Sequence, residues 1–326
     1  MVFWRAGLHP PRHWRTIMSG PTATLGAQGA RQLANTTKTP PQWVGTTPRW
    51  LVSLLPWTPV EAGTYRVNKV KEGGEENIGI ECSPSDGDEL PKAFVDYEEH
   101  PREYTLSTVT TTLDVQTRIS DLYRSPMDQV REQLAVLVEM VKERQERELI
   151  NNPNYGLLSH VIESQRISTR VGPPTPDDLD ELITKVWKEP AFFLAHPKAI
   201  AAFGRECTRR GVPPPTTTLF GSPFLTWRGL PLIPSDKLDV YQNDQGRYVS
   251  NILLLRTGEK KRGVVGLFQP GVPGEVSPSL SVRWMGINDR GAASYLVSLY
   301  CSAAVLAHDA IAVLQNVDIG NYHEYK

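Results

Sequence analysis

Histidine and aspartate side chains are the first candidates for chemistry in this chain. His308 is followed directly by Asp309 and could form a catalytic dyad with it, while His100 and His196 each stand next to a proline. An imidazole changes its charge near neutral pH, so each histidine could serve as a general base. Each also fits a plainer role, as a turn or surface histidine or, for His308-Asp309, at the N-terminus of a helix. We favour the plainer role at all three positions.

Two pairs of adjacent carboxylates, Glu98-Glu99 and Asp177-Asp178, could share a proton in acid–base catalysis. In a strand, neighbouring side chains point to opposite faces, which is a poor geometry for sharing a proton. The second pair follows a Thr-Pro dipeptide, which is typical of the start of a helix. We therefore interpret both pairs as solvated or helix-capping residues.

The three cysteines, Cys82, Cys207 and Cys301, are far apart and form no C-x-x-C pair. This usage fits a reducing cytosol and argues against a disulfide framework or a thiolate zinc site. We expect Cys207 and Cys301 in the core and Cys82 in an exposed loop. The sequence also lacks the P-loop, dinucleotide-binding, nucleophile-elbow and HExxH motifs. We predict no catalytic, metal-binding or cofactor-binding residues, and hence a chain that is not an enzyme.

The composition limits the class of protein further. With 326 residues, 40% of them hydrophobic and 22% charged, the chain can form about two domains, or one elaborate one, and bury a core. A net charge of −1 gives no overall electrostatic case for a nucleic-acid partner. No apolar run reaches the roughly 18–20 residues that a membrane helix needs. We predict neither a nucleic-acid partner nor a membrane span.

The Thr-rich segment 104–119 is predicted to be an unusually long strand. From Val109 onward, the odd positions are apolar or β-branched and the even positions are polar, which predicts one dry and one wet face. Upstream, Tyr104 and Leu106 are apolar at even positions, which indicates a bulge or a change of face near Ser107. Fully extended, the segment spans roughly 50 Å, about the diameter of a compact globule of this chain length.

A long helix should follow this strand. Ser125-Pro126 is a typical helix start, with Ser as N-cap and Pro at the first helical position. The predicted helix covers residues 126–152 and is apolar on two sides, so it packs between layers. Its last third, KERQERE, contains pairs such as Glu143 and Arg147 four residues apart, which we interpret as a solvated face.

The remaining elements alternate less regularly. A second helix, capped at Thr175, precedes a short buried strand and turn at 191–197 and a third helix at about 198–210. Strand-like segments dominate from residue 216 onward. These elements predict an α+β fold.

Residues 64–119 together resemble one two-stranded ribbon with a polar tip. An isolated ribbon is marginal in water, so it needs a surface to lie on. A ribbon too long for its own domain, and an extended N-terminal arm, could each lie on a neighbouring subunit and build a closed, symmetric assembly. The predicted inter-subunit contacts are Leu33 and Trp43 in the arm and Tyr104, Leu106, Val109, Thr111, Leu113 and Val115 in the ribbon.

Several long blocks of the sequence resemble the family 2A encapsulin shell proteins, which are bacterial relatives of the tailed-phage major capsid proteins. The resemblance extends from Ala30 to near the C-terminus. The blocks that carry it include TPRWL (47–51), FVDYEEHPREYTLSTVTTTLDVQTRISDLYRSP (94–126), QVREQLAVLVEMVKERQERELINNP (129–153), GVVGLFQPG (263–271) and SVRWMGIN (281–288).

The resemblance implies a capsid-like architecture with an N-terminal arm, an extended loop, a spine helix and an axial domain. It implies that the arm covers residues 18–48 and that the extended loop covers residues 64–119. The peripheral domain would consist of residues 49–63, 120–153 and 260–290, with the spine helix at 126–152. The axial domain would consist of residues 154–259 and 291–326. Residues 1–17 have no counterpart in the family, and we interpret them as a disordered extension or a start assigned upstream of Met18.

The resemblance also implies a function. The chain is expected to be a non-catalytic protomer of an icosahedral encapsulin nanocompartment in the cytoplasm, linked to sulfur metabolism or storage. Its expected partners are copies of itself and an enclosed cysteine desulfurase, which would carry the pyridoxal phosphate that the shell itself does not bind. Cargo-contacting residues are not identified. The alternatives are a phage-type major capsid protein and a soluble or membrane-associated enzyme.

Overall fold

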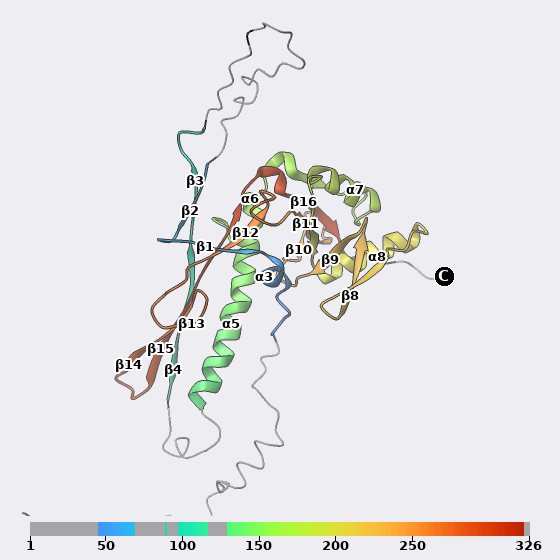
Figure 1. Ribbon diagram of the computed structural model, residues 1–326. Coiled ribbons are helices and arrows are strands. Elements are labelled where there is room, and N and C mark those ends of the chain that lie inside the picture. The colour runs from blue at the N-terminus through green and yellow to red at the C-terminus, as the bar shows by residue number, and fades with distance from the viewer. Residues whose placement is uncertain (1–44, 69–88, 90–96, 117–128, 323–326) are drawn as a thin grey trace, which may run out of the picture.

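The computed structural model describes residues 45–68, 89, 97–116 and 129–322. Within these residues the chain forms two β-sheets, a short two-stranded ribbon and one long helix that lies alongside the first sheet (Figure 1). The mixture of helices and strands confirms the predicted α+β class. The predicted contact residues Leu33 and Trp43, and Cys82, lie outside the described residues.

The first sheet has six strands in the described part of the chain, and β15 is its centre. β15 pairs antiparallel with β12, β14 and β4, and β1 pairs parallel with β12. The strands are β1 (Trp57–Pro59), β4 (Ser107–Val115), β12 (Val264–Phe268), β13 (Glu275–Ser277), β14 (Leu280–Ile287) and β15 (Ala293–Val305).

The long helix α5 (Gln129–Asn151) covers one face of this sheet. Val141 of α5 packs with Val297 and Leu299 of β15, and Val109 of β4 lies against the same cluster. α5 ends just before Pro153, as predicted, because proline cannot continue the helix. Its predicted start at residues 125–126 lies outside the described residues.

The Thr-rich segment forms two strands where one was predicted. β3 (Arg102–Thr105) pairs with β2 (Thr64–Val67) in the ribbon, and β4 begins after a break at Leu106. The alternation in β4 is confirmed, since Thr108, Thr110, Thr112 and Asp114 are exposed and the odd positions are partly or fully buried.

The ribbon prediction is wrong in its extent. β4 leaves the ribbon and pairs along its whole length with β15, from Ser107 opposite Cys301 to Val115 opposite Ala293. The dry face of β4 is therefore covered by α5 of the same chain. A strand with one apolar face needs a cover, but its sequence does not say which element supplies it.

The second sheet has eight strands in the described part of the chain, and β16, β11, β6 and β9 form its buried middle. Its strands are β5 (Arg166–Ser168), β6 (Phe192–Ala195), β7 (Thr216–Leu219), β8 (Ser222–Trp227), β9 (Leu230–Pro234), β10 (Tyr241–Gln242), β11 (Tyr248–Leu255) and β16 (Ile311–Asp318). The short helices α3 (Trp50–Leu54) and α6 (Leu157–His160) pack on one side of this sheet, with Leu253 and Val313 in the same core.

Helices α7 (Pro176–Lys185) and α8 (Pro197–Arg209) cover the other side of the second sheet. The predicted cap of α7 is confirmed: the Asp178 amide donates to Thr175 Oγ1 at 3.2 Å, and the Thr175 amide donates to Asp178 Oδ2 at 2.9 Å. Asp178 is buried, so it caps the helix rather than being solvated. The short predicted strand at 191–197 is β6.

The sheets correct one boundary of the expected domain division. Residues 260–290 and 291–326 were placed in different domains, but β14 and β15 form one antiparallel hairpin in one sheet. The chain changes sheet later, after Val305, where it continues to β16. The turn at Asn288–Gly291, where the division implied by the resemblance places the boundary, closes this hairpin.

Candidate functional site

In the suspected dyad at His308-Asp309, the aspartate pairs with two cations and so has a structural role. The Asp309 carboxylate accepts a hydrogen bond from Arg256 at 2.7 Å and pairs with Lys188 at 3.1 Å. The bond from Arg256 holds the pKa of Asp309 below its usual value, against a smaller opposite effect of burial. Because Arg256 is only 2% exposed, Asp309 supplies the counter-charge of a buried cation.

The other candidate bases and nucleophiles also have plain roles. His100 is exposed, and His196 caps α8 by accepting a hydrogen bond from the Lys198 amide at 3.1 Å. Burial raises the pKa of the Cys207 thiol to about 11 and that of Cys301 to about 12, so both thiols stay protonated and unreactive. Among the described residues, no group of three or more His, Cys, Asp or Glu side chains could hold a metal ion.

The predicted contact residues of the ribbon are largely used within the chain. Tyr104 is 5% exposed and donates its hydroxyl proton to the carbonyl oxygen of Val305 at 2.6 Å. Leu106 packs partly buried against the same cluster. Val115 is 1% exposed, so it offers almost no surface to a second subunit. The sequence could not show this, because Tyr104 bonds to Val305, 201 residues later, and Val115 lies opposite Ala293 of β15.

Val109, Thr111 and Leu113 remain partly exposed on β4. Val109 lies against the α5 cluster, so part of its apolar surface is already buried. Contact of these three side chains with a second subunit stays a prediction. In the described part of the chain, β4 pairs on one edge only, with β15, so its other edge still has main-chain groups that could pair with another strand.

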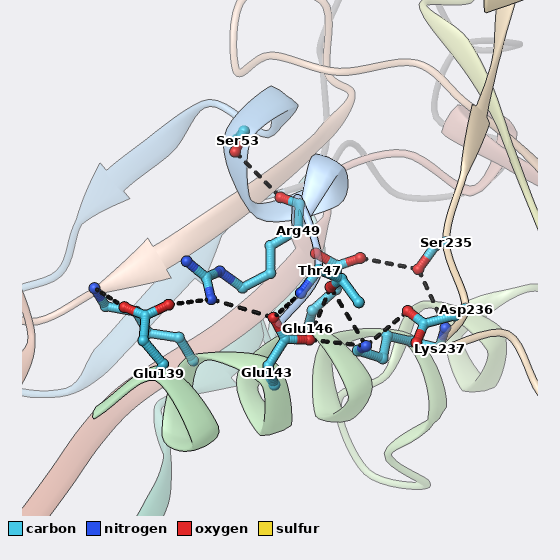
Figure 2. Close-up of polar contacts among 10 residues, drawn as sticks. Thr47, Arg49, Ser53, Glu139, Glu143, Glu146, Ser235, Asp236 and Lys237 are labelled. Atoms are coloured by element: carbon cyan, nitrogen blue, oxygen red, sulfur yellow. Dashed lines mark hydrogen bonds and ion pairs between the residues drawn. The ribbon is translucent and has the colours of Figure 1, made fainter. Parts of the chain in front are cut away.

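A polar cluster that the sequence did not reveal lies where the chain enters the fold. We call residues 45–49 the arm root, because they lie where the expected N-terminal arm (18–48) ends. The Thr47 amide and hydroxyl each donate to the Glu143 carboxylate at 2.8 Å (Figure 2). Arg49 donates to Glu139 at 2.6 Å and to Glu143 at 3.2 Å. The arm root is thereby fastened to one face of α5.

A third segment joins the same cluster from the turn after β9. Lys237 Nζ lies 2.8 Å from Glu143 and 2.6 Å from Asp236. Ser235 donates its hydroxyl proton to Glu146 at 2.9 Å. Figure 2 shows the carboxylates of α5 lying between the arm root and this turn. The cluster therefore connects the arm root, the long helix and the second sheet.

The electrostatics differ sharply among the three glutamates of α5. Burial alone would raise the pKa of Glu143, but hydrogen bonds from Lys237 and Thr47 outweigh burial and hold the pKa below its usual value. The pKa of Glu139 is lowered in the same way, because Arg49 and Lys142 together outweigh burial. At Glu146, burial prevails and the pKa is raised.

The cluster corrects the interpretation of KERQERE as a solvated face. Glu143 is 4%, Gln145 7% and Glu146 1% exposed, whereas Arg144 and Glu148 form the expected surface pair at 2.6 Å. The spacing of the three glutamates (139, 143 and 146) at i, i+4 and i+7 was the available signal, because it puts three carboxylates on one helix face. Their partners are about 90 residues away in both directions.

A groove of about 480 Å³ opens beside the arm root. Trp57, Phe268 and Leu299 contribute apolar walls, and Arg49 and Lys142 lie on its polar side. Both cations already pair with Glu139. The groove therefore has no built-in acid–base pair, and its surroundings fit packing better than chemistry.

Comparison with known proteins gives one consistent family. A model of the "SrpI-like" family, described as type 2A encapsulin shell protein, matches residues 64–321. The type 2A encapsulin shell protein SrpI of Synechococcus elongatus is 62% identical over 308 residues, which cover 94% of this chain and 98% of that protein. A type 2A encapsulin shell protein of Mycolicibacterium paratuberculosis is 56% identical, with 95% of this chain and 100% of the relative covered.

Solved structures agree in fold. The holo-SrpI encapsulin complex from Synechococcus elongatus matches with a TM-score of 0.78 and 60% identity, over 93% of this chain and 99% of that one. The capsid of a native GTA particle matches with a TM-score of 0.57 and 13% identity, over 90% of this chain and 100% of that one. The capsid of cyanophage P-SCSP1u matches with a TM-score of 0.53 and 13% identity, over 95% of this chain and 99% of that one. The last two show the capsid fold alone.

These findings confirm the expected fold and agree with a protomer that is not an enzyme. The relatives are named as shell proteins, and the suspected catalytic residues have structural roles. Within the described residues, no helix is both long and apolar enough to cross a membrane. With a family model that matches most of the chain and relatives above 50% identity over nearly their full length, the chain belongs to the type 2A encapsulin shell proteins.

Proposed function

We propose that this chain is a non-catalytic protomer that assembles with copies of itself into a closed, icosahedral nanocompartment in the cytoplasm. The observation that carries the proposal is the match to the holo-SrpI encapsulin complex, which covers 93% of this chain at a TM-score of 0.78. Similarity over nearly the whole length supports a shared mode of assembly, because the surfaces that meet in a shell are spread over the whole protomer.

The cargo forms the second part of the proposal. We propose that the compartment encloses a cysteine desulfurase and serves sulfur metabolism or storage, as the resemblance to subtype 2A implies. The pyridoxal phosphate that this reaction requires would belong to the cargo enzyme. Asp309 and His196, two of the residues that first suggested chemistry, serve a buried arginine and a helix cap, which supports a shell that contributes no catalytic group.

Assembly is tested by expressing the protein alone and combining size-exclusion chromatography with electron microscopy. Uniform hollow particles are expected. A monomer or small oligomer would contradict self-sufficient assembly. The ratio of absorbance at 260 and 280 nm separates the two capsid-like functions, since particles that enclose nucleic acid would favour the phage-type alternative.

The resemblance to subtype 2A implies that a disordered N-terminal segment targets the desulfurase to the interior of the shell. The cargo is therefore tested by co-expression with a cysteine desulfurase, both complete and without that segment. The complete enzyme should elute with the particles and give them the visible absorbance of pyridoxal phosphate. The truncated enzyme is the matched control and should elute separately. Particles that form but exclude both enzymes would overturn the cargo assignment and leave the assembly proposal intact.

A further inference from the structure

We propose that Glu146 is a proton-operated latch at the arm root. In its neutral form it allows the arm root, α5 and the turn at residues 235–237 to pack together, and loss of its proton loosens this junction. The proposal concerns the folded protomer itself, so it does not rest on the proposed cargo or on the size of the assembly.

The geometry favours a neutral carboxyl group at this position. Glu146 is 1% exposed, and it accepts hydrogen bonds from the Ser235 hydroxyl and from the main chain at Val52. Its second oxygen, Oε2, is buried and has no hydrogen-bond partner among the described residues. An ionised carboxylate would leave charge on this oxygen without water or a donor, which is costly in a protein interior.

The charges around Glu146 are already balanced without it. The charged side chains come from all three packed segments: Glu139, Lys142 and Glu143 on α5, Arg49 in the arm root, and Asp236 and Lys237 in the turn. These are three cations and three carboxylates, and they pair with one another. Lys237 attracts a charge on Glu146, but Glu143 repels it, so a fourth carboxylate would carry an excess negative charge.

The direction of the pH effect follows from burial. Burial raises the pKa of Glu146 above its usual value, outweighing the hydrogen bond from Ser235. The junction therefore holds this proton more firmly than the opened chain does. Its contribution to stability is complete below the usual pKa of 4.5 and is lost as the pH rises through the folded-state pKa. Glu143 acts in the opposite direction, because its pKa is lowered and its ion pair is lost in acid.

Hydrogen exchange of the full-length protein measures this junction directly. The amides of Ser53 and Leu55 donate to Arg49 and Leu51 within and beside α3, so their protection reports whether the arm root is closed. After correction for the intrinsic exchange rate, wild-type protection should fall as the pH rises from the usual glutamate pKa of 4.5 through the raised folded-state pKa, by about tenfold for each pH unit between the two. Each sample is taken from the same size-exclusion fraction, so assembly state is held constant.

Two variants separate the latch from general effects of pH. Glu146→Gln keeps a neutral side chain of the same shape and should make the protection independent of pH over this range. Glu148→Gln is the matched control, because Glu148 lies on the same helix outside the polar cluster and pairs with the exposed Arg144, and it should keep the wild-type pH dependence. Equal pH profiles for wild type and Glu146→Gln would overturn the proposal.

A spectroscopic measurement covers the case in which Glu146→Gln fails to fold. Infrared difference spectra of the wild-type protein, recorded as the pH is raised, should show loss of the carbonyl stretch of a protonated carboxyl group in the same pH range as the loss of protection. Absence of that band at a pH above the usual glutamate pKa of 4.5 would mean that Glu146 is already ionised in the closed junction, and the latch would be excluded.

Discussion

The carboxylate of Asp309 pairs with two cations, Arg256 and Lys188, and stabilises the fold mainly by supplying a counter-charge to the buried one, Arg256. Arg256 is 2% exposed and receives its strongest contact from Asp309 at 2.7 Å. A buried guanidinium without a counter-charge is far more costly than an exposed one. Sequence adjacency to His308 suggested catalysis, but the partner that matters lies 53 residues away.

Asp309→Asn should therefore destabilise the fold. We expect a loss of about 1–3 kcal/mol in the free energy of unfolding, because the ion pairs of Asp309 with Arg256 and Lys188 are replaced by weaker hydrogen bonds to a neutral amide. The wild-type advantage should be full above the usual aspartate pKa and disappear as the pH falls through the lowered folded-state value. Urea unfolding at neutral and acid pH measures both effects.

The control for this substitution is Glu189→Gln, which removes an exposed carboxylate that pairs with Lys261. Its free energy of unfolding should change by no more than about 0.5 kcal/mol. If Asp309→Asn were equally mild at neutral pH, Arg256 would not depend on Asp309 as its counter-charge.

Tyr104→Phe tests the second residue that the sequence assigned to another role. The Tyr104 hydroxyl donates to the Val305 carbonyl oxygen at 2.6 Å in a buried cluster, so its removal should cost about 0.5–1.5 kcal/mol in the free energy of unfolding. Tyr97→Phe, at a side chain that is 60% exposed, should be neutral. A particle yield that falls for Tyr104→Phe without any change in unfolding would instead restore the predicted inter-subunit role.

At the scale of elements, features that depend on neighbouring residues could be predicted, whereas contacts between residues far apart in the sequence could not. The end of α5, the Thr175 cap of α7 and the alternation of β4 each depend on residues within a few positions of one another. The partner of β4 does not, because β15 lies about 190 residues away. A period-two pattern fixes which side chains face a cover, but it carries no information on whether the cover belongs to the same chain.

The same distinction explains the errors at the arm root. Glu143 and Glu146 belong to a charged stretch of α5 that reads as solvated, because charged runs on a helix usually face water. They are buried by Thr47, 96 residues earlier in the chain, and by Ser235, 89 residues later. The local signal was the presence of three carboxylates on one helix face. It indicates that the face has polar partners, but it does not identify them.

The two faces of β4 give the prediction at this scale. Val115→Asp places a charge where the side chain is 1% exposed, so it should prevent stable folding of the first sheet. Thr112→Asp places the same charge on the exposed face and should cost about 1 kcal/mol or less. Soluble yield and thermal melting of the two variants measure the contrast.

The outcome of this pair decides how the strand is used in the shell. Loss of particles from a normally folded Thr112→Asp protein would place a second subunit on the wet face of β4. A folded, soluble Val115→Asp protein would contradict the packing of α5 and β15 described above. Substituting only residues of the dry face could not separate folding from assembly, because that face is already part of the core of its own chain.

At the scale of the whole molecule, the arm root adds a polar connection between parts that also share an apolar core, in which Leu149 of α5 and Val305 of β15 pack with Leu253 of β11. α5 covers the first sheet, and its carboxylates accept hydrogen bonds from Thr47 and Arg49. The turn at 235–237, which follows β9 of the second sheet, pairs with the same carboxylates through Lys237. An arm that engages another subunit would pull on this junction. A firm root allows the force to reach both sheets, whereas a loose root would let the arm move independently.

Glu143→Ala tests this connection. The substitution removes the acceptor of Thr47, Arg49 and Lys237 and leaves Lys237, about 10% exposed at its side chain, without this buried partner. Because breaking one side of a buried ion pair typically costs about 3–5 kcal/mol, the arm root should open, while the apolar cores that hold the two sheets keep them folded. Hydrogen exchange should show lost protection at residues 50–55 alone, and electron microscopy should show fewer closed particles. Glu148→Gln, on the same helix but outside the polar cluster of the arm root, should change neither readout. Open arm roots together with a full yield of closed particles would mean that the arm is held by its neighbours in the shell, and that its attachment to its own chain contributes nothing to assembly.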